Sequence, residues 1–154
     1  AGVSTSSVHA YIVGEHGDTE FPHWSRATIG TVPILDWQPL DGQPPFTVEE
    51  LDRIAVDVRD AAYTVIRGKG ATNYAIGLSS ARIVEAILGD QHAVMPVSTV
   101  LSDFQGVDGV ALSVPSVVSS AGARPILETS FSDDELALFH RSADALGAVA
   151  ASLR

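Results

Sequence analysis

A histidine in the segment GEHGD, residues 14–18, is the side chain in this sequence best placed to do chemistry. It directly follows the apolar run VHAYIV and lies between two glycines and two carboxylates. Histidine has an unperturbed pKa close to neutral pH, and a loop that follows a strand presents reactive groups on a rigid support. Gly17 would let a substrate approach closely. We therefore consider His16 a candidate general acid and base. The alternative is a histidine in a polar turn, with Asp18 capping the segment that follows.

Metal binding and covalent catalysis find less support in the sequence. His16, Asp18 and His23 are spaced i, i+2, i+7 through a turn, which does not match a helical pair of metal ligands, so we expect no metal site. Serines are plentiful, but no Gly-x-Ser-x-Gly segment is present to activate one of them. The sequence contains no cysteine, which excludes a thiolate zinc site, a disulfide framework and a cysteine nucleophile.

A dinucleotide-binding loop is also missing from the sequence. The nearest approach to Gly-x-Gly-x-x-Gly is GKGATN, residues 68–73, which lacks the final glycine and follows a predicted helix rather than a strand. We therefore expect no Rossmann domain in this chain. If His16 serves a cofactor-dependent enzyme, the cofactor is held elsewhere.

The composition indicates one soluble domain. The chain has 154 residues, of which 45% are hydrophobic and 18% charged, and its net charge is −10. Neither a basic run nor an apolar stretch of membrane-spanning length occurs, so we expect no nucleic-acid or membrane binding and a cytoplasmic location. The low charged content indicates either that another domain or subunit covers part of the surface or that the chain is simply rich in alanine and valine. The sequence begins with Ala1 rather than methionine, which leaves open a fragment, a processed product or a complete gene product.

The first half of the chain is predicted to hold two strands and two helices. The run VHAYIV, residues 8–13, predicts a buried strand, and TIGTVPILDW, residues 28–37, a second short one. Thr47 and Glu50 form a capping box, which predicts a helix that ends near Gly68 and Gly70. The predicted apolar face of this helix comprises Leu51, Ile54, Ala55, Val58, Ala62, Val65 and Ile66. A second helix is predicted from about Thr72 to Leu88, with Ala75, Leu78, Ala81, Arg82 and Ile87 on its face.

The second half is predicted to hold strands and a closing helix. Residues 93–101 and 110–118 have strand-like composition, and QGVDG supplies a turn between them. Pro96 and Pro115 favour edges or bulges over central strands. RPILET predicts a short third strand, and SDDE, residues 132–135, is a second capping box. The closing helix has Leu136, Phe139, Ala143, Leu146, Val149 and Leu153 on one face. Helices and strands in blocks predict an α+β fold with an antiparallel sheet.

Several of these segments together resemble the NAD-dependent L-lactate dehydrogenases. VHAYIVGEHGD, the Pro-x-Trp-Ser of residues 22–25 and IGTVP are similar to the segment around that family's catalytic histidine. GKGATNYAIGLSSARIVEAIL, residues 68–88, is similar to a second signature, and VALSVPSVV and the SDDE helix to the C-terminal end. The resemblance covers essentially all of residues 1–154 and corresponds to the family's C-terminal, substrate-binding half. It implies that an N-terminal NAD-binding Rossmann half lies upstream.

The resemblance implies a mixed α/β substrate domain and reversible hydride transfer between pyruvate with NADH and (S)-lactate with NAD⁺. It makes His16 the proton donor and acceptor, and it places Thr72 and Ala62 beside the substrate's side chain. Ile76 corresponds to the apolar residue against the nicotinamide. Because the missing half would hold most of the NAD and the groups that orient His16 and grip the substrate carboxylate, the isolated chain is expected to be inactive.

Two further expectations and two alternatives accompany the resemblance. The resemblance places His9 at the position of a histidine that binds fructose 1,6-bisphosphate between subunits of the activated bacterial enzymes. We therefore expect an allosteric homo-oligomer, a tetramer. The alternative for His9 is an ordinary histidine on a surface strand. Malate dehydrogenases usually have a smaller residue where Thr72 stands, so lactate is favoured over malate or another 2-hydroxy acid. The competing class is a non-enzymatic stand-alone domain for assembly or small-anion binding.

Overall fold

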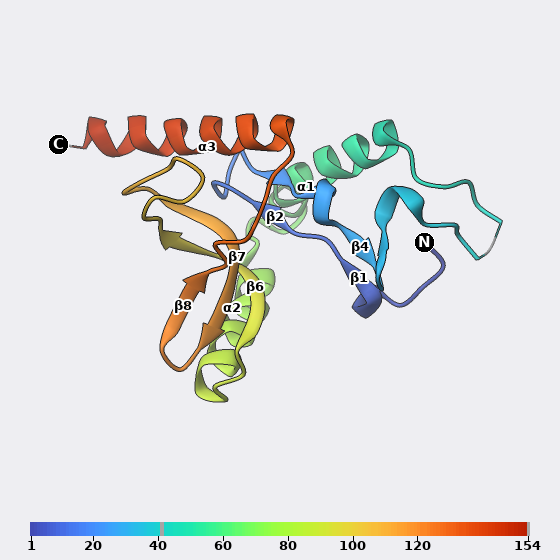
Figure 1. The fold of residues 1–154 in the computed structure, drawn as a ribbon, viewed down its shortest axis with the longest axis horizontal. Coiled ribbons are helices and arrows are strands. Elements are labelled where there is room, and N and C mark those ends of the chain that lie inside the picture. Colours follow the sequence, from blue (N-terminus) through green and yellow to red (C-terminus); the bar gives the residue numbers. More distant parts are fainter. Residues whose placement is uncertain (41, 154) are drawn as a thin grey trace.

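The computed structural model describes residues 1–40 and 42–153, which form three small antiparallel sheets and three long helices (Figure 1). In chain order the elements are β1 Val8–His9, β2 Ile12–Val13, β3 Phe21–Pro22, β4 Thr28–Ile29, β5 Val32–Pro33, α1 Val48–Lys69, α2 Asn73–Leu88, β6 Ala93–Val100, β7 Ala111–Ser119, β8 Gly122–Pro125 and α3 Asp133–Ser152. The sheets have the orders β1-β4-β5, β2-β3 and β6-β7-β8. The predicted α+β fold is confirmed: every strand pair in the described residues is antiparallel, so they contain no Rossmann domain.

The run VHAYIV does not form the single buried strand that its composition predicts. It divides into β1, in which Val8 pairs with Ile29 of β4, and β2, in which Val13 pairs with Phe21 of β3. The run is apolar because it bridges two hydrophobic clusters. Val8 packs against the cluster around Leu51, whereas Val13 lies in the larger cluster between β7 and α3. Of residues 8–13, Val13 alone is fully buried. The predicted second strand is a hairpin of β4 and β5.

The two middle helices begin and end close to their predicted bounds, but their predicted faces are largely exposed. Thr47 Oγ1 accepts a hydrogen bond from the Glu50 N–H at the start of α1, and Gly70 ends that helix with a φ of 81°. Leu51 is the buried residue of the predicted α1 face, whereas Val65 and Ile66 are exposed. In α2 the buried residue is Ala86, so the predicted face is wrong for its exposed members Ala75, Leu78, Ala81 and Arg82. Periodicity could not choose between the sides, because both helices have apolar residues on more than one side.

The β6-β7-β8 sheet contradicts the prediction that both prolines avoid central strands. Pro96 lies in the edge strand β6, but its partner Pro115 lies in the central strand β7. The carbonyl of Pro115 accepts a hydrogen bond from the N–H of Ile126, one residue beyond the end of β8. In a strand the N–H and C=O of one residue point to the same side, so Pro115 lacks its donor where the neighbouring strand ends. The third strand is predicted over RPILET, residues 124–129, but β8 covers Gly122–Pro125, so that prediction is wrong for residues 126–129.

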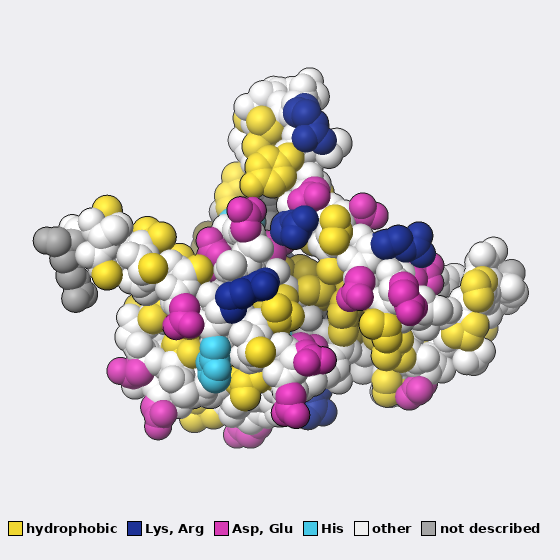
Figure 2. All heavy atoms as spheres, turned by 90° about the horizontal axis from the view of Figure 1, so that it is seen from above, with side chains coloured by type: hydrophobic (Ala, Val, Ile, Leu, Met, Phe, Trp, Pro, Cys, Tyr) yellow, Lys and Arg dark blue, Asp and Glu magenta, His cyan; other side chains and the backbone are white. Residues whose placement is uncertain are grey.

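Helix α3 closes the main hydrophobic cluster. Its predicted capping box is present, with Ser132 Oγ accepting from the Glu135 N–H and the Glu135 carboxylate accepting from the Ser132 N–H. Phe139 is completely buried and contacts the rings of Phe104 and Phe131 at 5.8 and 5.0 Å between centroids. The helix extends past the sheet (Figure 1), and apolar side chains remain at the surface toward its C-terminal end (Figure 2), among them Leu153 with 83% of its surface exposed. Among the described helices, none has the length and hydropathy to cross a membrane.

Replacing the central aromatic residue of α3 should destabilise the fold strongly. Phe139→Ala removes a fully buried ring, and we expect the free energy of unfolding to fall by about 3–5 kcal/mol, the usual cost of such a cavity. Leu153→Ala, at an exposed position just after the same helix, should change the free energy by less than about 0.5 kcal/mol. Urea denaturation followed by circular dichroism measures both values, and equal effects would contradict this account of the core.

Candidate functional site

The turn that carries His16 is anchored to the central strand of the large sheet. Gly14 exchanges two backbone hydrogen bonds with Ser113 of β7, at 2.8 and 2.9 Å between nitrogen and oxygen. The chain then turns, with the Glu20 N–H donating to the Gly17 carbonyl, and returns as β3. The side chain of His16 is 99% exposed, and its Nδ1 lies 3.5 Å from Glu20 Oε2. The imidazole therefore projects into solvent from a fixed backbone, with a carboxylate placed to pair with it when it is protonated.

A cavity of about 790 Å³ begins at this turn. Glu15, His16 and Glu20 border it, Val58 and Ile76 line it from the two middle helices, and parts of β6 and β7 line it from the sheet. Its wall is therefore mainly apolar, with the polar groups of the turn at one side. No lysine or arginine is among its lining residues in the described chain. Such a space suits a small organic molecule, but it offers no lysine or arginine to an anionic one.

Of the other residues that the resemblance assigns to substrate, cofactor or effector binding, Ile76 alone lines the same cavity as His16. Ile76 is 62% exposed on α2. Thr72 is the half-buried N-cap residue of α2, Ala62 is exposed on α1, and neither lines the cavity. His9 is exposed in β1 opposite Thr28, within a different sheet.

A contact that the sequence did not indicate links the turn to α1. The Tyr63 hydroxyl lies 3.5 Å from Asp18 Oδ1, and Tyr63 directly follows Ala62. One turn earlier, Arg59 forms an ion pair with Asp60 at 2.9 Å. Hydrogen bonding to Asp60, supported by that charge and more weakly by Asp18 and Glu20, raises the pKa of Arg59. The Arg59 guanidinium is therefore paired with a carboxylate in this structure.

Glu135 of α3 is a buried carboxylate, for which the sequence suggested only a role in a helix cap. Burial alone would raise the pKa of Glu135, but hydrogen bonds from the Ser25 hydroxyl, the Ser25 N–H and the Ser132 N–H outweigh it, so the pKa lies below its ordinary value. His23 is buried beside it, with Nε2 at 3.0 Å from the Ser130 carbonyl and 3.8 Å from Glu135 Oε2. A carbonyl only accepts, so this nitrogen carries a proton. The pair holds the segment after β3 against α3.

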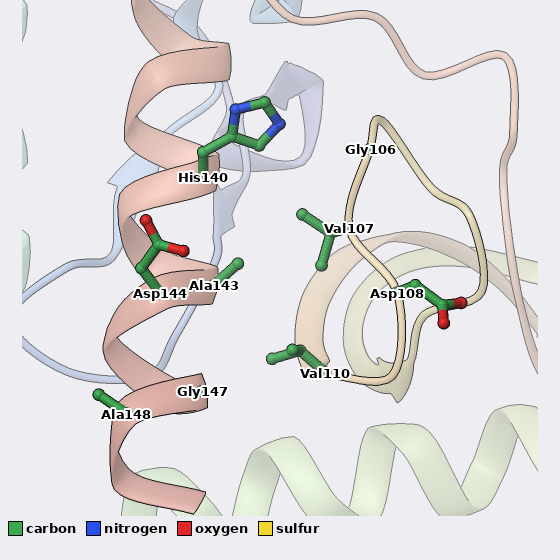
Figure 3. Close-up of a pocket in the computed structure, with 9 residues that line it drawn as sticks. All are labelled: Gly106, Val107, Asp108, Val110, His140, Ala143, Asp144, Gly147 and Ala148. Carbon is green, nitrogen blue, oxygen red and sulfur yellow. The ribbon is translucent and has the colours of Figure 1, made fainter. Parts of the chain in front are cut away.

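A second hollow, of about 590 Å³, lies between α3 and the loop of residues 106–110 (Figure 3). Val107 and Val110 point toward the helix, and His140 points toward the tip of the loop, where its Nε2 lies 2.8 Å from the Gln105 carbonyl. The ionisable groups that line it besides His140 are Asp108 and Asp144. None of the residues singled out from the sequence for chemistry lies here, so the cavity beside His16 is the candidate site.

Comparison with known proteins identifies the family of the chain. The model of the lactate/malate dehydrogenase α/β C-terminal domain matches residues 1–152. The chain belongs to this family. The L-lactate dehydrogenase of Bifidobacterium animalis subsp. lactis is 51% identical over 150 residues, covering 97% of this chain and 47% of that protein. That of Oceanobacillus iheyensis is 46% identical over 94% of this chain and 44% of its own length.

Solved structures support the same assignment of fold and family. The minor L-lactate dehydrogenase of Enterococcus mundtii, in a ligand-bound form, superposes with a TM-score of 0.89 at 41% identity, over 99% of this chain and 48% of that one. A lactate dehydrogenase from a deep-sea metagenome gives 0.86 at 36% identity. The chain thus spans about half the length of the lactate dehydrogenases that it matches. The domain expected from the GEHGD and GKGAT segments is confirmed.

The network around Glu135 makes the stability of this lactate/malate dehydrogenase domain depend on pH. A carboxyl whose pKa is lowered by folding stabilises the fold above its unfolded pKa of about 4.3, and this contribution is lost as the pH falls through the lower folded pKa. Glu135→Gln places an amide NH₂ against hydrogen-bond donors, so we expect it to cost about 1–3 kcal/mol at pH 7 and progressively less below pH about 4.3. Urea denaturation at pH 7 and again below pH about 4.3 measures this loss of unfolding free energy. Glu128→Gln, at an exposed position, is the control, and a constant cost for Glu135→Gln would contradict the assignment.

Proposed function

We propose that residues 1–154 form the substrate-binding and catalytic half of an NAD-dependent L-lactate dehydrogenase, which interconverts pyruvate and (S)-lactate. The observation that carries the proposal is the exposed His16 beside a cavity that it shares with Ile76, in a chain similar to L-lactate dehydrogenases. The lactate dehydrogenases it matches are about twice as long, which leaves room in such a protein for an NAD-binding domain.

In this proposal His16 moves the proton. Protonated at the edge of the cavity, the imidazole donates a hydrogen bond to the ketone oxygen of pyruvate and polarises the carbonyl. As the carbonyl carbon is reduced, the negative charge that grows on the oxygen takes the proton, which leaves lactate and a neutral imidazole. In the reverse direction the neutral imidazole accepts the hydroxyl proton. Glu20 Oε2 lies 3.5 Å from His16 Nδ1, close enough to pair with the imidazolium.

The cofactor fits the described residues at one point. When bound, NADH supplies the hydride. Ile76, an exposed apolar side chain on the wall of the cavity, is suited to contact a nicotinamide ring and to favour its neutral form. Because no lysine or arginine lines the cavity in the described chain, the substrate carboxylate takes its cation from residues outside this chain. Thr72 and Ala62 are proposed to border the substrate's side chain once those residues complete the pocket.

The exposed apolar faces of α1 and α2 support a covering partner. Val65, Ile66 and Leu78 are between 41% and 76% exposed. Large apolar side chains exposed on two helices are typical of an interface. We propose that the NAD-binding half and further copies of the protein cover these faces in a cytoplasmic homotetramer.

The first test measures pyruvate-dependent NADH oxidation by the full encoded protein. Replacing His16 with alanine should lower kcat/KM by about 10²- to 10⁴-fold, the usual contribution of a positioned acid–base group. His92→Ala, an exposed histidine in a turn outside the cavity, should have no effect. Residues 1–154 alone should show no turnover. A loss of less than tenfold for His16→Ala would remove His16 from this role, and a preference for oxaloacetate over pyruvate would make the enzyme a malate dehydrogenase.

The second test concerns His9. If two subunits bind fructose 1,6-bisphosphate between them with His9 as a ligand, the effector should lower the KM for pyruvate of the full encoded protein, and His9→Ala should abolish that activation without changing the basal rate. Steady-state kinetics with and without the effector measure this. The variant His140→Ala, changed in α3 and not in β1, should still be activated by the effector. Activation that survives in His9→Ala would show that the effector site lies elsewhere.

A further inference from the structure

The buried face of α3 contains a serine that contacts the turn of His16. Ser142 lies in the hydrophobic stripe between Phe139 and Ala143, and its exposed fraction is 0%. Its Oγ accepts a hydrogen bond from the Glu15 N–H at 2.6 Å and lies 3.1 Å from Thr19 Oγ1. The hydroxyl therefore contacts both ends of residues 15–19, which are more than 120 positions away in the sequence.

These contacts form a closed ring of three residues. The Glu15 N–H donates to Ser142 Oγ, and the Thr19 hydroxyl donates to the same oxygen. Thr19 Oγ1 also contacts the Glu15 carboxylate, so its single proton is shared between Ser142 Oγ and Glu15. His16 lies within the segment that this ring closes.

The neighbouring glycines fit the same arrangement. A Cβ at Gly17 would lie 2.5 Å from Glu15 Oε1, so the absence of a side chain lets the Glu15 carboxylate fold back toward Thr19. A Cβ at Gly14 would lie 2.8 Å from Ser142 Oγ, and this glycine also has a φ of 91°. Both glycines of GEHGD thus leave room for the groups that form the ring.

We propose that Ser142 is a positioning residue, which fixes the turn of residues 15–19 and thereby the direction of the His16 imidazole. Its link to catalysis rests on the proposed function, whereas its effect on the turn does not. Without this hydroxyl the Glu15 N–H and the Thr19 hydroxyl both lose an acceptor. The turn then keeps its backbone bonds to β7 through Gly14 but gains freedom at His16.

The decisive comparison is between two buried serines. Ser142→Ala should raise the hydrogen–deuterium exchange rate of the Glu15 amide at least tenfold in the full encoded protein and lower kcat about fivefold or more. Ser116→Ala is the matched control, because Ser116 is equally buried but donates only to the Val114 carbonyl of its own strand. Ser116→Ala should leave both quantities unchanged. Equal exchange at Glu15 in the two variants would overturn the inference.

A second pair of variants keeps the test decisive if Ser142→Ala does not fold. Thr19→Val preserves shape but removes the hydroxyl, and should accelerate exchange at Glu15; Thr19→Ser retains the hydroxyl and should restore the native exchange rate. If Thr19→Val and Thr19→Ser exchange alike, the ring does not hold the turn and the inference fails. If the exchange rates follow the prediction in a protein without dehydrogenase activity, the proposed function fails and the positioning of the turn by Ser142 stands.

Discussion

The structure depends on the need of buried polar groups for partners. Glu135 and Ser142 are both buried in α3, seven residues and thus two helical turns apart, with Phe139 between them on the same side. An unpaired buried hydroxyl or carboxylate is costly, so each group must be matched by the segment packed against it. Glu135 bonds Ser25, and Ser142 bonds the turn of His16. Residues 15–25 lie between these two contacts, and their one strand, β3, has only two residues. The buried face of α3 therefore holds this segment in place.

Periodicity predicted the elements of the fold better than it predicted their partners. The bounds of α2 and α3 and the pairing of β6 with β7 follow from caps, glycine stops and residue composition, which are local properties. The exposed faces of α1 and α2 do not, because an apolar side of a helix contains no information about whether its partner belongs to the same chain. Pro115 shows the same limit: its place in a central strand is possible only because the neighbouring strand ends beside it, which is a property of another segment.

The candidate site divides in the same way. His16 could be proposed because a histidine between glycines and carboxylates follows an apolar run and because GEHGD resembles a family segment, and Ile76 because GKGAT resembles a second one. Tyr63 and Ser142 gave no signal, and Glu135 indicated only a helix cap, since the partners that link them to other segments lie more than 40 positions away and a serine in an apolar stripe resembles a weak point in a helix face. What could not be predicted is thus the support of the candidate group rather than the candidate itself.

The charges around His16 support the proposal that residues outside this domain complete the site. GEHGD and the two residues after it contain three carboxylates, yet each has a partner: Glu15 bonds Thr19, Asp18 contacts Tyr63, and Glu20 lies beside His16. No lysine or arginine lines the cavity in the part of the chain that the structure describes. Under the proposed function a 2-keto acid presents both a ketone oxygen and a carboxylate, and one imidazole can serve the first but not the second. The apolar cavity, the one histidine among its lining residues and the exposed helix faces then fit a single arrangement, in which residues beyond this domain bind the carboxylate.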